Sequence, residues 1–196
     1  MIQTTTSKLH WNYFLALDHD LELVSRYVEF CEPHFDVYSI EFAHILFAAA
    51  SEVDVIAKLL CKQLNPKARC RDINDYRAVL RAALPALPAT HVLVPRYGLT
   101  LTPWDNWKRP SNPDWWHSYN KVKHQRDVHF NKATLQNALN ALGGLLIFTF
   151  YHYSYSLSKT PGSPLRSVLT TAELQPESTL LRLPDDYYCK HLVVTT

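Results

Sequence analysis

The sequence predicts an all-α fold, a bundle of about five helices, from three observations. Residues 37–64 contain neither Pro nor Gly, and their apolar side chains point in nearly every direction around a helix, as in a central buried helix. Residues 132–156 are almost as apolar and predict a second core helix. Glycine occurs only 4 times in the 196 residues, which disfavours a fold built from tight hairpins.

Capping residues and prolines set the limits of the first two helices. The first helix is predicted over 17–32, with Asp18 or Asp20 as its N-cap and Pro33 directly after its end. The long second helix is expected to begin after Asp36, whose side chain can cap it.

Three more helices are predicted further along the chain. A short third helix is expected over 72–84, where prolines end it. The fourth and fifth are predicted over 115–131 and 132–156. The fifth carries the Gly143-Gly144 pair, which lets a neighbouring helix approach closely.

An irregular segment lies between the third and fourth predicted helices. Residues 91–94 and 99–102 flank the turn sequence Pro-Arg-Tyr-Gly, which favours a small hairpin or paired extended strands. A small irregular or β insertion is therefore predicted near 91–102.

The composition changes after residue 157, where the chain becomes rich in Ser, Thr and Pro. We therefore predict a helical-bundle domain over 1–157 and a short C-terminal appendage over 158–196. Short strands are expected at 179–183 and 192–195, packed on the body.

The net charge and the absence of some known sequence motifs limit the classes of function that the protein can have. The net charge is +2 with His neutral, which is too small to indicate nucleic-acid binding by itself, so any electropositive surface has to be local. No Gly-rich run could cradle a phosphate, which excludes a P-loop site. The four Cys lack zinc-site spacing, and neither a metal nor a cofactor is expected.

Two segments bear on location and membrane contact. Residues 1–8 lack the basic start and apolar run of a signal peptide, so a cytoplasmic protein with reduced thiols is expected. Residues 138–155 are apolar but interrupted by polar side chains, and they fall short of the roughly 20 residues that a spanning helix needs. No membrane partner is expected.

The stretch Trp115–Phe130 combines aromatic and basic side chains and is the most informative part of the sequence. At roughly 100° per residue, Arg126 falls in the middle of an apolar helical sector about 60° wide. That sector is formed by Tyr119, Val122, Phe130 and Ala133, with Lys123 at its margin. A buried Arg stays charged and needs acceptors, so Arg126 is expected to meet Glu52 or Asp54 of the central helix, or a bound anion.

Two interpretations of Arg126 stay open. It is either a structural ion-pair residue or part of a site with His129, which follows one turn later. In a site, His129 could act as general acid or base while Arg126 stabilises a phosphate anion held by Lys123 or Asn120. His129 is equally compatible with a surface position near a helix end, and His124 projects away from Arg126.

The central helix carries charged side chains of its own. Asp54 and Lys58 are four residues apart and are expected to pair. The candidate residues are the catalytic pair Arg126 and His129 and the binding candidates Tyr119, Asn120, Lys123, His124, Glu52, Asp54 and Lys58.

The pattern Trp-Trp-x-x-Tyr-Asn-Lys-Val-Lys-His-x-Arg at 115–126 resembles that of an uncharacterised bacterial family grouped near the HEPN superfamily of helical-bundle domains. The long buried second helix and the polar motif at 123–127 are similar to HEPN domains over residues 18–157. Active members are metal-independent RNases of toxin and antiviral systems, whose motif is an Arg, four to six residues and a His. Here His129 follows Arg126 after two residues, and such families also contain inactive members that act as binding modules.

Three functional hypotheses follow. The first is a HEPN-like, non-catalytic binding or regulatory module, with an unidentified protein partner or as a homodimer through an exposed aromatic face of the fifth helix. That face consists of Phe148, Phe150, Tyr151, Tyr153 and Tyr155. The second is a metal-independent endoribonuclease using Arg126 and His129. The third is a binder of RNA or another nucleic acid that uses basic residues and stacking tryptophans, namely Lys121, Lys123, Lys132, Trp104, Trp107, Trp115 and Trp116.

Overall fold

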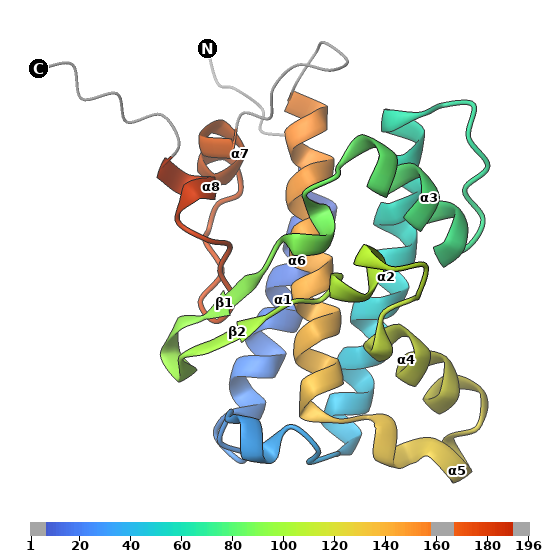
Figure 1. Cartoon of the computed structure of the whole chain (residues 1–196). Coiled ribbons are helices and arrows are strands. Elements are labelled where there is room, and N and C mark those ends of the chain that lie inside the picture. Colours follow the sequence, from blue (N-terminus) through green and yellow to red (C-terminus); the bar gives the residue numbers. More distant parts are fainter. Residues whose placement is uncertain (1–6, 158–166, 190–196) are drawn as a thin grey trace, which may run out of the picture.

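The computed structural model describes residues 7–157 and 167–189 and confirms an all-α bundle with a small β insertion (Figure 1). The long helices are α1 (Leu9–Val24), α2 (Ile40–Leu64) and α6 (Leu135–Leu157). The shorter helices are α3 (Ile73–Ala83), α4 (Asp114–His124), α5 (Arg126–His129), α7 (Ser167–Glu173) and α8 (Asp186–Cys189). The strands are β1 (Val92–Val94) and β2 (Leu99–Leu101). No helix in these ranges is long and apolar enough to cross a membrane.

Helices α2 and α6 form the centre of the bundle and lie along each other (Figure 1). Helix α6 is buried over most of its surface, as predicted, whereas α2 buries one side and exposes Glu41, His44, Ser51 and Val55, so its prediction as a helix buried all round holds only in part. The prediction for α2 is confirmed at its end, Leu64, but the helix begins at Ile40 and not at 37. Ser39 caps it in place of Asp36, because the Ser39 hydroxyl oxygen accepts a hydrogen bond from the Phe42 N–H at 3.1 Å.

Helix α1 begins and ends earlier than the sequence predicted, at Leu9 and Val24. Its apolar face already starts in the first turn, and it consists of Trp11, Phe14, Leu17 and Leu21. These side chains bury against the core, so helical packing extends upstream of the predicted cap. Asp18 and Asp20 therefore lie inside the helix, and the prediction that one of them caps it is wrong.

The predicted bounds of the third helix and of the two hairpin strands agree with the structure to within one residue at each end. Asp72 caps α3, since its carboxylate accepts hydrogen bonds from two backbone N–H groups of the first turn. Strands β1 and β2 are antiparallel, with Val92 opposite Leu101. Gly98 ends the connecting turn with a φ of 64°, in the left-handed region that Gly adopts without strain.

The C-terminal segment (167–189) packs on the body beside β1 (Figure 1). Arg182 pairs with Leu93 of β1 through two backbone hydrogen bonds of 2.7 and 2.9 Å, so the strand predicted at 179–183 is present as a single bridge. Its buried apolar residues join the core of the helices, and they are Leu174, Leu180, Leu181 and Leu183. The strand predicted at 192–195 lies outside the described residues.

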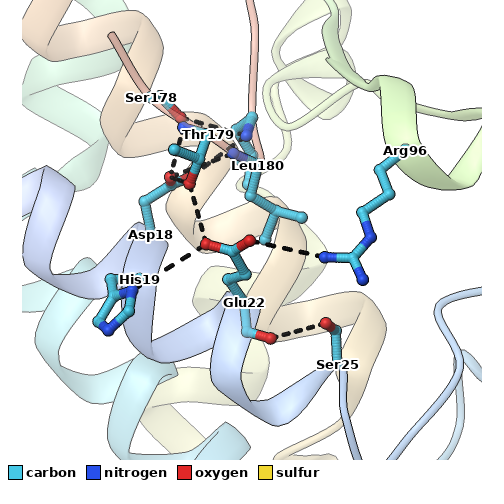
Figure 2. A network of polar contacts seen from close by, with 9 residues as sticks. Asp18, His19, Glu22, Ser25, Arg96, Ser178, Thr179 and Leu180 are labelled. Atoms are coloured by element: carbon cyan, nitrogen blue, oxygen red, sulfur yellow. Dashed lines mark hydrogen bonds and ion pairs between the residues drawn. The ribbon is translucent and has the colours of Figure 1, made fainter. Parts of the chain in front are cut away.

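Asp18 of α1 holds the C-terminal segment in place (Figure 2). Its carboxylate is buried and accepts hydrogen bonds of 3.1–3.2 Å from three successive backbone N–H groups, those of Thr179, Leu180 and Leu181. Burial raises the pKa of Asp18, while these hydrogen bonds act in the opposite direction. The buried acid thus satisfies backbone donors that would otherwise lack an acceptor.

Glu22 lies one turn beyond Asp18 and continues this polar network (Figure 2). Its carboxylate accepts a hydrogen bond from the Thr179 hydroxyl at 3.0 Å. It also pairs with Arg96, in the turn of the hairpin, at 3.5 Å. Helix α1 therefore binds both the hairpin turn and the C-terminal segment.

The four tryptophans between residues 104 and 116 pack against the bundle. Three are buried and the last is half-buried, in the order Trp104, Trp107, Trp115 and Trp116. The Trp104 ring stacks on Phe148 of α6 with centroids 4.2 Å apart. The close approach predicted at Gly143-Gly144 is confirmed: Trp115 of α4 and Trp104 lie against Gly144, and side chains of the hairpin lie against Gly143. Trp104, Trp107 and Trp115 are therefore packing residues of the core, and the expectation that they form a stacking surface for nucleic-acid bases is wrong.

The prediction of an exposed aromatic face for dimerisation is wrong. Phe148, Phe150 and Tyr151 are buried, and Tyr153 and Tyr155 are half-buried. Other elements cover α6 on this side: for example, Tyr187 of α8 meets the ring of Phe150 edge-on at 5.1 Å.

Candidate nucleic-acid interface

The fourth predicted helix is interrupted in its second half. Helix α4 ends at His124, Gln125 has an extended φ of −144°, and α5 begins at the next residue. Val122 and Ala133 still pack together against α2, on either side of the break. The segment between them leaves the helical register of α4, so the predicted sector around Arg126 does not form.

Arg126 is exposed, which contradicts the prediction that it enters the core. Its guanidinium lies over the ring of Phe47 of α2, 5.1 Å from the ring centroid. A cation over an aromatic face is attracted by the negative charge density of the ring. Arg126 therefore keeps contact with water and needs no buried carboxylate.

The acids of α2 have other partners than Arg126. Asp54 pairs with Lys58, as predicted, and accepts a hydrogen bond from the Tyr76 hydroxyl of α3 at 2.7 Å. Glu52 binds Nδ1 of His10 in α1 at 2.5 Å. The predicted ion pair between α2 and the α4–α5 segment is therefore wrong, and these acids connect α2 to α1 and α3.

Basic side chains gather where α4 ends and α5 begins, and we call this surface the basic corner. Its members are exposed, and they are Lys121, Lys123, His124, Arg126 and Lys132. Within the described ranges, none of them pairs with a carboxylate. Lys123 donates a hydrogen bond to the Tyr119 hydroxyl at 3.1 Å and lies 5.3 Å from the centre of that ring. A chain with a net charge of only +2 thus has a local positive surface here.

Aromatic rings lie beneath and beside the basic corner. Tyr119 contacts both Phe47 and Trp116, with centroid distances of 6.0 and 5.5 Å. Tyr38 meets Phe130 edge-on at 5.6 Å, and Tyr38 is 52% exposed. Surfaces that bind single-stranded nucleic acids combine positive charge with accessible ring faces in this way.

The other candidates on α4 and α5 differ in placement. Tyr119 is buried, and Asn120 is half-buried and donates its amide hydrogen bond to a carbonyl of its own helix at 2.9 Å. His124 is exposed and His129 is half-buried. In the part of the chain that the structure describes, neither Arg126 nor His129 makes a hydrogen bond or an ion pair through its side chain.

A polar network that no sequence pattern indicated joins α1, α2 and α6. The ring of His10, bonded to Glu52, meets His152 edge to face with centroids 5.4 Å apart. His152 Nδ1 in turn bonds Gln63 Oε1 at 3.1 Å. Burial, and then the charge of His10, lower the pKa of His152 to about 4. These residues are far apart in the sequence, so no local spacing could have revealed them.

The low pKa of His152 predicts a loss of stability in mild acid. In the unfolded chain this His binds a proton near its usual pKa of 6.5, whereas the folded state excludes the proton until about pH 4. Stability is therefore lost as the pH falls from about 7 to 4, by about 3 kcal/mol from this group. His152→Asn retains a donor for Gln63 and should flatten this part of the pH profile in urea unfolding. Parallel profiles for the two proteins would contradict the assignment.

Comparison with protein-family models, curated proteins and solved structures found no match for this chain. Among the described residues, no group of three or more His, Cys, Asp and Glu side chains could hold a metal ion. Cys31, Cys61 and Cys70 are free thiols. The basic corner itself offers positive charge and ring faces, which suit an anionic partner with planar groups.

Proposed function

We propose that this protein is a non-catalytic, HEPN-like binding module whose basic corner binds single-stranded RNA. The observation that carries the proposal is the set of exposed basic side chains at the junction of α4 and α5, none of which pairs with a carboxylate of residues 7–157 or 167–189. A cation that is already paired has to give up its partner before it can bind phosphate. The cations of the basic corner, in contrast, are available to release counterions from an RNA backbone.

The neighbouring rings support a single strand over a duplex. Bases of a single strand are accessible and stack on aromatic side chains or on Arg guanidinium planes. Tyr38 is exposed beside the basic corner, and the Arg126 guanidinium lies over the Phe47 ring, 5.1 Å from its centroid. The long buried α2 and the polar motif at 123–127 support the HEPN-like part of the proposal.

Removal of basic-corner charges is expected to weaken RNA binding and its salt dependence together. For a single strand, the logarithm of the binding constant falls with the logarithm of salt concentration by about 0.7 per phosphate contact. Lys121→Gln and Lys132→Gln should each reduce this slope by about 0.7 and weaken binding of all sequences alike. The measurement is fluorescence anisotropy of a labelled twelve-nucleotide RNA of mixed sequence at several salt concentrations.

The matched control is Lys67→Gln, which removes the same charge from an exposed site just beyond the opposite end of α2. Its affinity and salt slope should equal those of the wild type. An equal loss in Lys67→Gln, or no binding by the wild type at low salt, would contradict the proposal. RNA that is cut in EDTA by the wild type, but not by a folded His129→Ala variant, would replace it by the ribonuclease hypothesis.

A further inference from the structure

A polar pocket of about 280 Å³ lies between the start of α4, the start of α6 and the loop after β2. The side chains used below are Asp105, Arg109, Asp114, Gln136, Asn137 and Asn140. Ligand pockets for drug-sized molecules span roughly 300–1,000 Å³, so this one suits a smaller, polar group. In the fold described above, the charged side chains of this pocket do not connect elements of the core.

Two amide side chains of α6, Asn137 and Asn140, line this polar pocket, and their NH₂ groups are already hydrogen-bonded. Asn137 donates its NH₂ group to the backbone carbonyl of Lys132 at 2.8 Å. Asn140 donates its NH₂ group to the carbonyl of Gln136 at 2.9 Å. Because only the NH₂ side of an amide can donate, both Oδ1 atoms remain as acceptors for a ligand.

The charged groups of the polar pocket favour a ligand that carries both donors and acceptors. Two carboxylates, Asp105 and Asp114, line it together with the guanidinium of Arg109. Asp105 also pairs with Lys108, and the Asp114 carboxylate accepts a long hydrogen bond of 3.5 Å from the Asn106 amide. In the described chain, the Arg109 side chain forms no hydrogen bond or ion pair. A lining with more acceptors than donors and two negative charges against one positive charge disfavours a phosphate.

We infer that this polar pocket binds a guanine base of the RNA strand, an inference that rests on the RNA binding proposed above. The Watson–Crick edge of guanine has two adjacent donors, N1–H and N2–H₂, which fit the two oxygens of the Asp114 carboxylate. Its O6 and N7 atoms are acceptors that fit the fork of the Arg109 guanidinium.

The other bases fit this lining less well. Adenine and cytosine each offer one amino group beside a ring nitrogen whose lone pair would face the carboxylate. Uracil has a single N–H between two carbonyl oxygens, which the carboxylate repels. Guanine is the base whose donors and acceptors match a carboxylate and a guanidinium at the same time.

The polar pocket and the basic corner lie close enough for one strand to occupy both. Asp114 begins α4 and Lys121 and Lys123 end it, and the 11 residues of this helix span about 16 Å. On the other side, the hydrogen bond of Asn137 reaches the backbone of Lys132, a member of the basic corner. A short single strand can therefore place its phosphates on the basic corner and one base in the polar pocket.

The test compares short oligouridine RNAs that carry G, A, C or inosine at one central position. The wild type should bind the G-containing RNA roughly fivefold to a hundredfold more tightly than all-U RNA. Inosine, which lacks the N2 amino group, should lose much of this preference. Asp114→Asn and Arg109→Gln should remove the preference for G while binding all-U RNA, and thermal melting should show that both variants fold.

The matched control is Asp127→Asn, which removes a negative charge from exposed α5 beside the basic corner. It should strengthen binding of every RNA by the same factor and leave the preference for G intact. Equal binding of all the RNAs, unchanged in Asp114→Asn, would overturn the guanine pocket and leave the RNA-binding function standing. Failure of every RNA to bind would overturn the proposed function itself.

Discussion

Asp18→Ala is expected to lower the free energy of unfolding by about 3–5 kcal/mol, the range for removing one side of a buried charged network. The carboxylate accepts hydrogen bonds from three backbone N–H groups at 179–181. Ala leaves these donors buried without an acceptor, and each such group costs about 1–3 kcal/mol. Urea unfolding followed by tryptophan fluorescence measures the loss.

Two further variants separate the hydrogen bonds of Asp18 from helix effects and from charge. Asp20→Ala lies on the same helix but is exposed, and it should unfold like the wild type. Asp18→Asn keeps an acceptor oxygen and should lose less than Asp18→Ala. If Asp18→Ala and Asp20→Ala unfold alike, the anchoring role of Asp18 is wrong.

The raised pKa of Asp18 gives the comparison with Asp18→Asn a definite pH dependence. The folded protein binds the Asp18 proton at higher pH than the unfolded chain does, because burial penalises the charged form. The wild type should therefore gain stability relative to Asp18→Asn as the pH falls towards 3.8, the usual pKa of Asp. A relative loss in acid would have the wrong sign for a buried, desolvated carboxylate.

Gly144→Val is expected to destabilise the fold by about 3 kcal/mol or more. A Cβ at this position of α6 would lie 3.2 Å from ring carbons of both Trp104 and Trp115. Neither ring can move aside, since Trp104 is stacked on Phe148 at 4.2 Å and the Trp115 indole N–H donates to the Pro103 carbonyl at 2.9 Å. The branched side chain adds two methyl groups to this contact.

Smaller changes at glycines test the steric cause. Gly144→Ala gains about 1 kcal/mol of helix propensity, yet it should still destabilise the protein because the rings crowd its methyl group. Gly98→Ala meets no atom within 4 Å and should cost only about 1–2 kcal/mol, from its left-handed φ of 64°. Thermal melting and near-ultraviolet circular dichroism of the tryptophans measure both. A Gly144→Ala protein that melts like the wild type would contradict the tight packing.

Local sequence patterns predicted the parts of the fold that depend on neighbours in the chain. The end of α2 at Leu64, the bounds of α3 and the pair of Asp54 with Lys58 follow from periodicity, the positions of prolines and a four-residue spacing. The position of α1 did not follow, because Asp18 acts there on a segment 161 residues further along the chain and not on its own helix terminus.

The sequence could predict the site only where its residues are close together in the chain. Lys123 and Arg126 belong to one short motif, so the sequence could group them. It could not indicate the break at Gln125, which no Pro or Gly marks, and the break places Arg126 on the surface. The polar pocket was also out of reach, because its lining comes from 102–115 and 136–140 and depends on how α4 and α6 meet.

The hydrogen bonds of Asp18 have a consequence for folding during synthesis. The first long helix of the described chain is held by residues 179–181, which leave the ribosome much later than α1 does. Closing so long a loop carries an entropic penalty, and a nascent chain can form these bonds only after residues 179–181 have left the ribosome. Until then, the face of α1 around Asp18 stays uncovered, so α1 reaches its final packing only when this distant segment joins it.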